Sequence, residues 1–150
     1  MQWKPNVTVA AIAEDNGRYL LVEEDVDNLI VFNQPAGHLE KNETLLDAVK
    51  REVMEETARE FEPQSLVGVY LYPNPHRDIM YLRFCFAGRC IQHHADEPLD
   101  DGIIRAVWMT RDEIEAHHEK MRSPMVRRCI DDYLAGKHYP LEMLNHFERD

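Results

Sequence analysis

Short runs of apolar and β-branched residues alternate with polar stretches along most of the chain. Runs of this length, bounded by Gly, Pro, Asn or acidic residues, are typical of β-strands. Asn16-Gly17 lies between the first two runs and predicts a tight hairpin turn. Residues 23–28 and 93–102 are polar and acidic and predict loops. The predicted strands are residues 7–13, 18–22, 29–32, 65–72, 78–87 and 103–109.

One central stretch shows the period of a helix instead. It starts at Asn42, a good N-cap, and Glu43 falls in the first turn, where negative charge is favourable. No Gly or Pro interrupts the run, and Pro63 breaks regular structure beyond it. Its apolar residues recur at helical spacing and predict a buried stripe: Leu45, Leu46, Val49 and Val53.

Two more helices are predicted after the last strand. Thr110 is an N-cap, with Glu113 at the capping-box position. A final helix starts at Ser123, with Pro124 as its first helical residue, and Gly136 ends it. Strands around one helix, followed by two late helices, predict a layered α/β (α+β) fold. Apolar residues of the tail are expected to pack back on the domain: Leu141, Met143 and Leu144.

The central helix carries three carboxylates at the border of its apolar stripe. At ~100° per residue, Glu52, Glu55 and Glu56 fall within an arc of about 100°. Such carboxylates repel one another unless a cation lies among them, and Mg²⁺ prefers oxygen ligands and substrate phosphates. A solvated acidic helix face is the alternative, because charged helix faces are common.

The whole stretch resembles the Nudix box, GX5EX7REUXEEXGU, in which U is apolar. Gly37 is followed by Glu43 after five residues, and Arg51-Glu52 follows after seven more. Two positions depart from the motif, since Ala58 replaces a Gly and Arg59 an apolar residue. That Gly is suited to the left-handed end of a helix, where Ala costs ~1 kcal/mol. The helix is therefore expected to end differently or to run longer.

Shorter strings extend the likeness to the NudJ branch of bacterial Nudix phosphatases. They occur at residues 5–10, 32–40, 122–124 and 139–143. The resemblance implies a Nudix α/β/α sandwich around a mixed sheet, in a single domain over residues 1–150. It also implies a small phosphorylated substrate, such as a thiamine-type pyrophosphate or a nucleotide.

Composition narrows the class of protein. The chain has 150 residues, of which 44 % are hydrophobic, enough for one full core. Its net charge of −11 and the lack of a basic cluster argue against a nucleic-acid polymer as partner. Three cysteines without a CxxC pair indicate neither a disulfide framework nor a zinc site. With no signal-like or membrane-length apolar run, a cytoplasmic protein is expected, as a monomer or a small homo-oligomer.

The resemblance assigns roles to the residues of the box. The implied reaction is attack of water on a phosphorus of a diphosphate or triphosphate, assisted by Mg²⁺ or Mn²⁺. Glu52, Glu55 and Glu56 are the implied metal ligands, and the Gly37 carbonyl is a further candidate. Glu52 is alternatively the general base. Arg51 is expected to orient the site by pairing with Glu43 or Glu52, unless it forms a routine surface ion pair.

Many Nudix enzymes use one more acidic residue from a loop after the sheet. The candidates here are Asp96, Glu97, Asp100 and Asp101, and we favour Asp101. An acidic loop that is simply solvated is the alternative.

Residues that recognise the substrate are harder to identify. Arg83 lies in an apolar strand and either reaches a phosphate or faces outward at an edge. Phe32 and Tyr72, like Tyr70 and Tyr81, either stack on a heterocycle or belong to the core. His76 and Arg77, which follow Pro75, are weaker candidates for phosphate contacts.

Three functions remain open. The first is a NudJ-like hydrolase that releases phosphate from thiamine pyrophosphate, hydroxymethylpyrimidine pyrophosphate and nucleoside di- and triphosphates. The second is a nucleoside triphosphate or ADP-ribose pyrophosphohydrolase, because the box does not read the group attached to the phosphates. The third is a catalytically silent nucleotide-binding module, which the complete set Glu52, Glu55 and Glu56 disfavours.

Overall fold

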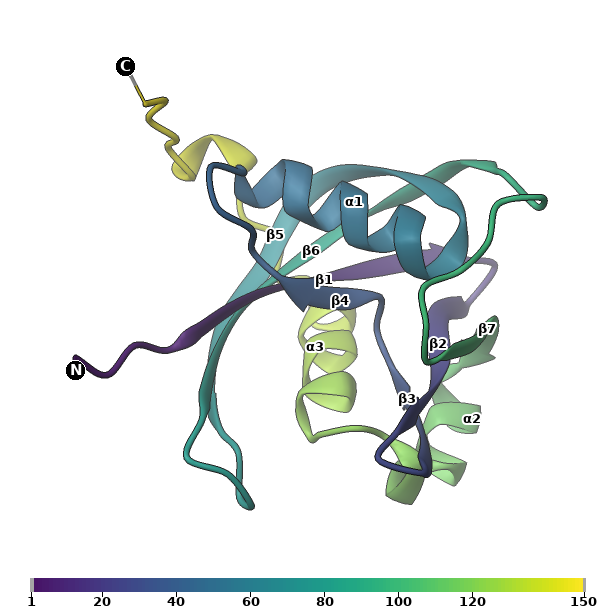
Figure 1. The fold of residues 1–150 in the computed structure, drawn as a ribbon. Helices are drawn as coiled ribbons and strands as arrows, with labels where there is room; N and C mark the ends of the chain where they lie inside the picture. Colours follow the sequence, from purple (N-terminus) through teal and green to yellow (C-terminus); the bar gives the residue numbers. More distant parts are fainter. Residues whose placement is uncertain (1, 150) are drawn as a thin grey trace.

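A seven-stranded mixed sheet organises the chain in the computed structural model, which describes residues 2–149 (Figure 1). The strand order is β3-β2-β1-β6-β5, while β4 pairs with β1 and β7 with β2. β1 and β6 run parallel, and the other paired strands are antiparallel. The strands are β1 (Asn6–Asp15), β2 (Arg18–Val26), β3 (Leu29–Asn33), β4 (Ala36–His38), β5 (Arg59–Pro73), β6 (Met80–His93) and β7 (Ile103–Thr110).

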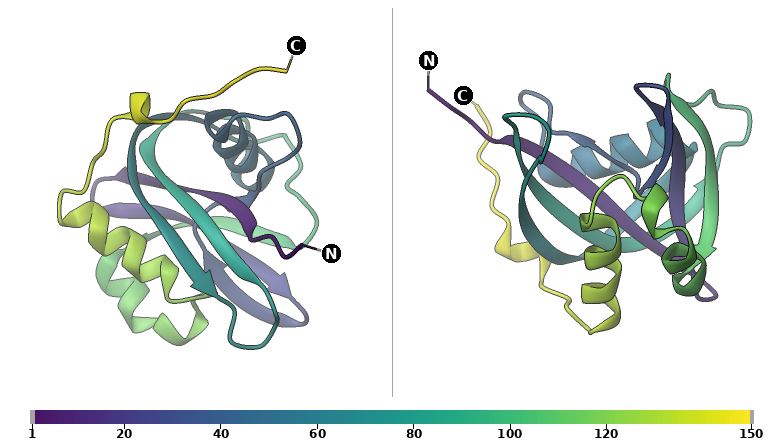
Figure 2. Two further views of the ribbon diagram at one scale, coloured as in Figure 1. Left: turned by 90° about the vertical axis from the view of Figure 1, so that its left-hand side faces the viewer. Right: turned by 90° about the horizontal axis from the view of Figure 1, so that it is seen from below.

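Helices cover both faces of this sheet. α1 (Leu45–Thr57) lies on one face, and α2 (Arg111–Ala116) and α3 (Met125–Leu134) lie on the other. Figure 2 shows the two layers of helix from the side and from below. Two short 3₁₀ turns, η1 (His118–Lys120) and η2 (Leu141–Met143), complete the elements. The predicted α/β class and its layered arrangement are confirmed.

β1 connects the two halves of the core because both of its faces are buried. Val9 and Ala11 face α1 and pack with Val49, whereas Ala10 and Ile12 belong to the cluster on the α3 side. Successive side chains of a strand point to opposite faces, which explains the division. A strand covered on both sides reads as a continuous apolar run, as the sequence does here.

Several strands extend beyond their predicted ends. The hairpin at Asn16-Gly17 is confirmed, since both residues have positive φ, at 50° and 77°. β2 continues to Val26, so a loop over residues 23–28 was wrong for most of that stretch. Pairing with β3 and β7 supplies hydrogen bonds to this acidic segment. β6 likewise reaches His93 instead of ending at residue 87.

Pro63 does not break the chain as predicted. β5 begins directly after α1 and passes through Pro63, with register shifts on both sides of it. β5 is an edge strand of the sheet, the kind of strand in which Pro is tolerated because only one side of it pairs with a neighbouring strand of the sheet. The register shifts around Pro63 are typical of β-bulges, which bend the strand and interrupt the regular pairing with its neighbour.

The two ends of α1 differ from the prediction. Asn42 is not the N-cap: it lies in a turn with φ 66°, and Thr44 caps the helix by accepting from Asp47 N at 3.0 Å. Glu43 therefore precedes the helix. At the other end Ala58 adopts the left-handed conformation, with φ 56°, and its N–H donates to Met54 O. The helix ends where the Nudix motif has its Gly, and the expectation of a different or later end was wrong.

The later helices follow the predicted signals closely. The Thr110–Glu113 capping box at α2 is confirmed. α3 begins at Met125, so Pro124 precedes the helix instead of opening it. In the tail, Leu141 and Leu144 pack on the α1-side cluster, but Met143 is 56 % exposed and does not.

Over residues 2–149, every helix is too short or too polar to span a bilayer.

Candidate active site

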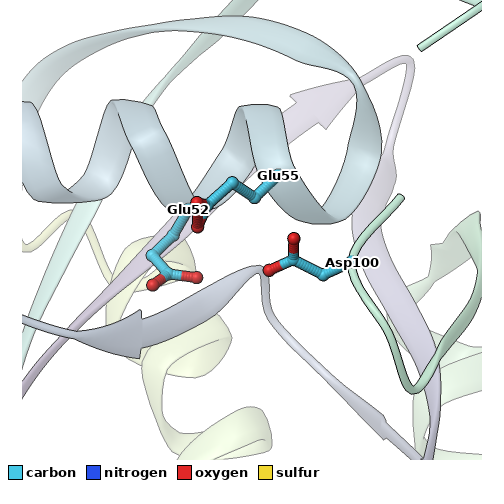
Figure 3. Close-up of side chains that lie close together, drawn as sticks. All are labelled: Glu52, Glu55 and Asp100. Atoms are coloured by element: carbon cyan, nitrogen blue, oxygen red, sulfur yellow. The ribbon is translucent and has the colours of Figure 1, made fainter. Parts of the chain in front are cut away.

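Three carboxylates from two separate segments converge beside α1. Oxygens of Glu52, Glu55 and Asp100 all lie within 4.8 Å of one another (Figure 3). The Asp100 backbone N–H donates to Glu55 O at 2.9 Å, which holds the loop against the last turns of α1. Asp101, the residue favoured from the sequence, is not part of this cluster. The acidic loop after β6 does reach the site, but through the neighbouring residue.

Glu56 points to a different place from Glu52 and Glu55. Its Oε1 accepts a hydrogen bond from Ala36 N at 2.9 Å, and the side chain lines the adjoining cleft. Burial raises the pKa of Glu56 to about 9, against the lowering effect of the Ala36 hydrogen bond. The three glutamates share one border of the helix as predicted, but Glu56 lies outside the cluster of three. Its role as a metal ligand stays a prediction.

Arg51 forms hydrogen bonds with two members of the acidic cluster and with Glu43. Its Nε donates to Glu43 Oε2 at 2.7 Å, and its Nη1 donates to Glu52 and Glu55, each at 2.8 Å. Nη2 reaches the His38 carbonyl at 3.0 Å. The hydrogen bond to Glu43 is the main reason that the pKa of Arg51 is raised. Glu43 and Glu52 were predicted as alternative partners, and the arginine binds both.

Gly37 lies against the carboxylate of Glu52. A Cβ at this position would stand 2.2 Å from Glu52 Cδ and Oε1. β4 holds Gly37 opposite Val9 of β1, so the backbone cannot simply move away. Only glycine permits this close approach without a shift of Glu52. The use of the Gly37 carbonyl as a metal ligand stays a prediction.

The chemistry of this cluster fits a hard divalent cation. Glu52, Glu55 and Asp100 offer carboxylate oxygens, the donors that Mg²⁺ and Mn²⁺ prefer. Burial raises the pKa of Glu52 to about 7, with Arg51 opposing the rise and the Glu55 and Asp100 charges adding to it. A cation among the three would favour their charged forms.

A cleft of about 710 Å³ opens next to the cluster. Gly37, Glu52 and Glu56 are among the residues that line it, as are Leu29 and Val31 of β3. The tip of the β5–β6 hairpin lines the cleft too, through residues that include Tyr72, His76, Arg77 and Tyr81. The predicted substrate contacts Tyr72, His76 and Arg77 therefore have access to a ligand in this space.

Two other predicted recognition residues have opposite outcomes. Arg83 is 4 % exposed and lines the cleft, so the alternative of an outward-facing edge residue was wrong. Phe32 is buried in the α3-side core and packs edge-to-face against His117, with ring centroids 6.3 Å apart. Phe32 is a core residue, and its proposed stacking on a heterocycle was wrong. Tyr70 likewise packs against the core and donates to Asp132 Oδ2 at 2.7 Å.

Sequence reasoning missed several polar residues around the cleft. Asn33 and Gln34 both bond to Arg83, and Arg122 lies at the cleft with its Nη1 on Glu24 Oε1 at 2.9 Å. The available signal was the polar pair Asn33-Gln34 directly after an apolar strand. Asn33 is the last residue of β3 and Gln34 begins the loop after it, and polar residues on such loops are frequently functional.

Comparison with known proteins gives a consistent result. The NUDIX domain family matches residues 3–129. The chain is 39 % identical to phosphatase NudJ of Escherichia coli K12 over 145 residues, which cover 97 % of this chain and 94 % of that protein.

Solved structures agree. A NUDIX hydrolase from Nitrosomonas europaea is 47 % identical, with a TM-score of 0.96 over 98 % of this chain and 100 % of that one. A MutT NUDIX hydrolase from Burkholderia pseudomallei shares the fold, with a TM-score of 0.73 at 19 % identity over 87 % of this chain and 98 % of that one.

Proposed function

Because the chain belongs to the Nudix hydrolase family and is a homologue of the NudJ phosphatases, we propose which bond it hydrolyses and in which molecules. The substrates are organic diphosphates and triphosphates, namely thiamine pyrophosphate, hydroxymethylpyrimidine pyrophosphate and nucleoside di- and triphosphates. The enzyme releases inorganic phosphate one group at a time. The observation that carries this proposal is that Glu52 of the Glu52–Glu55–Asp100 cluster lines the same cleft as Arg83.

Glu52, Glu55 and Asp100 would hold Mg²⁺ or Mn²⁺, and Glu56 and the Gly37 carbonyl are further candidates. When bound, the ion activates water and neutralises phosphoryl oxygens. Arg51 keeps Glu52 and Glu55 in place through its two contacts of 2.8 Å. The protein positions charges that match those developing on the phosphoryl group, which is the main requirement of phosphoryl transfer.

The cleft also supports a substrate with a ring. Tyr72 and Tyr81 lie directly opposite each other on β5 and β6, and both line the cleft. Aromatic side chains in that position can pack against a heterocycle. A small phosphorylated molecule fits a space of about 710 Å³. A nucleic-acid polymer is a poor partner for a chain with a net charge of −11.

The test is turnover with Mg²⁺ on thiamine pyrophosphate, a nucleoside triphosphate and ADP-ribose, with phosphate and pyrophosphate measured separately. Phosphate release from the first two supports the proposal. Pyrophosphate release, or cleavage of ADP-ribose alone, assigns the enzyme to the pyrophosphohydrolase alternative. If none is hydrolysed although metal binds, a silent binding module replaces the proposal.

A further inference from the structure

Arg83 carries a buried charge that no carboxylate neutralises. Its side chain lies inside the protein at 4 % exposure, and within residues 2–149 it takes part in no ion pair. The charge of a buried arginine is strongly unfavourable unless a counterion or hydrogen bonds compensate it. The described part of the chain therefore keeps a cation at the cleft without supplying a matching carboxylate.

Two partners of Arg83 are the neutral amide oxygens of Asn33 and Gln34. Nη1 donates to Gln34 Oε1 at 2.9 Å, and Nη2 donates to Asn33 Oδ1 at 3.2 Å. Nη1 also faces the Cys129 sulfur at 3.9 Å. Nε has no hydrogen-bond partner in the described part of the chain. Of the five guanidinium N–H groups, the one on Nε and one on Nη2 therefore remain without an acceptor.

Gln34 fixes the orientation of this arrangement. Its Nε2 donates to the carbonyl of Val126 in α3 at 2.7 Å, which leaves Oε1 to face Arg83. Gln34 is 1 % exposed, so water does not compete for either bond. The guanidinium is thus held in place by an amide that is itself anchored to a helix.

The sheet sets the backbone spacing between Arg83 and the acidic cluster. Thr8 of β1 pairs with His38 of β4 on one side and with Arg83 of β6 on the other. Neighbouring strands are ~4.8 Å apart, so the Arg83 backbone lies about 10 Å from the backbone of β4, where Gly37 touches Glu52. The Arg83 side chain reaches across part of this gap to Gln34, two residues before β4. Glu52 and Arg83 both line the cleft, so one substrate can contact both.

The tyrosines lie beyond Arg83 on the same side of the sheet. Tyr81 precedes Arg83 by two residues on β6, so both side chains share a face, and Tyr72 pairs with Tyr81. Along the sheet, β4 with Gly37, β6 with Arg83 and β5 with Tyr72 follow one another, with β1 between β4 and β6. A ring packed against the tyrosines would place its attached phosphate near Arg83 and the terminal phosphate toward the carboxylates.

We propose that Arg83, held by Asn33 and Gln34, is an anion subsite for the phosphate group attached to the organic part of the substrate. The proposal rests on the proposed function, because it orients a diphosphate in that active site. The neutral amide of Asn33 is essential to it: a carboxylate at residue 33 would neutralise Arg83 from within and remove the attraction for substrate.

The first experiment compares Arg83→Met and Asn33→Asp with Arg89→Met, which removes a charge from an exposed part of the same strand. In the presence of Mg²⁺, kcat/KM for a nucleoside diphosphate is expected to fall about 10- to 100-fold in the first two variants. Arg89→Met should match the wild type. Asn33→Asp should keep its melting temperature, because it adds an ion pair in place of a neutral hydrogen bond.

The second experiment measures binding of inorganic phosphate to the metal-free protein in EDTA by calorimetry, at constant ionic strength. Wild type and Arg89→Met should bind, and Arg83→Met and Asn33→Asp should bind at least tenfold more weakly. Wild type that binds phosphate through Arg83 but hydrolyses nothing refutes the proposed function and leaves the subsite intact. Turnover and phosphate binding that both survive in folded Asn33→Asp overturn the subsite, even if Arg83→Met fails to fold.

Discussion

Arg51 and Arg83 serve the same cleft in opposite surroundings. Arg51 pairs with four carboxylates, those of Glu40, Glu43, Glu52 and Glu55. Arg83 is more deeply buried, yet its partners are two amides and a sulfur. The charge of Arg51 is neutralised within the protein and serves to position acidic groups. Within residues 2–149 no carboxylate pairs with Arg83, and we assign its charge to the substrate.

The largest effect is expected at the acidic end of the cleft. Glu52→Gln removes a carboxylate that contacts Arg51 and Gly37 and is a candidate metal ligand or base. We expect kcat with Mg²⁺ to fall about 10²- to 10⁴-fold, measured as phosphate release. Glu62→Gln, which changes an exposed glutamate of β5, is the matched control. Activity within threefold of wild type in Glu52→Gln would place the chemistry elsewhere.

Replacing Arg51 tests whether its role is to position the cluster. Arg51→Met leaves Glu52 and Glu55 without their shared partner, and kcat/KM should fall about 10- to 100-fold. Arg51→Lys should recover little of this loss, because one ammonium cannot replace a planar fork. Binding of inorganic phosphate to the metal-free protein should persist in both variants. Its loss would mean that the two arginines do not act separately.

Replacing Tyr72 of the cleft should have a smaller effect on kinetics, and this effect should be confined to substrate binding. Tyr72→Leu removes an aromatic ring beyond Arg83, worth about 1 kcal/mol of contact with a substrate ring. KM for thiamine pyrophosphate should rise about fivefold while kcat stays within twofold. Steady-state kinetics on this substrate and on inorganic tripolyphosphate, which has no ring, distinguishes a contact of Tyr72 with the ring from a contact with the phosphates. An equal change for both would argue against a ring at Tyr72.

The smallest effect on catalysis is expected at the start of α1. Thr44→Ala removes the hydrogen bond to Asp47 N and should lower stability by about 1 kcal/mol, or ~2–4 °C in melting temperature. kcat/KM should not change, because the cap lies at the opposite end of the helix from Glu55. Thr44→Ser should keep the wild-type melting temperature. A loss of activity in Thr44→Ala at temperatures where it is folded would link helix stability to the chemistry.

The helix and its carboxylates were readable from the sequence because they depend on spacing along one element. Glu52 and Glu55 share a helix border for geometrical reasons alone. The sequence did not distinguish Asp100 from Asp101. Asp100 is held at the cluster by the hydrogen bond from its backbone N–H to Glu55 O. Adjacent loop residues point in different directions, and composition does not distinguish them.

Residues of the core and the cleft were ambiguous for a similar reason. Phe32 and Tyr72 are both aromatic strand residues. Tertiary packing alone determines that Phe32 lies in the core and that Tyr72 lies at the cleft. Asn42 had the better sequence signal for an N-cap, yet Thr44 takes that role because a turn precedes it. Local propensity is a weak guide wherever long-range contacts decide the outcome.

The pairing of Thr8 with both β4 and β6 fixes the spacing between the strand that holds Gly37 and the strand that holds Arg83. A triphosphate has one more phosphate group than a diphosphate to place between Arg83 and the carboxylates. Arg83→Met should therefore change the ratio of kcat/KM for a nucleoside diphosphate to kcat/KM for its triphosphate, which a parallel assay of both nucleotides can measure.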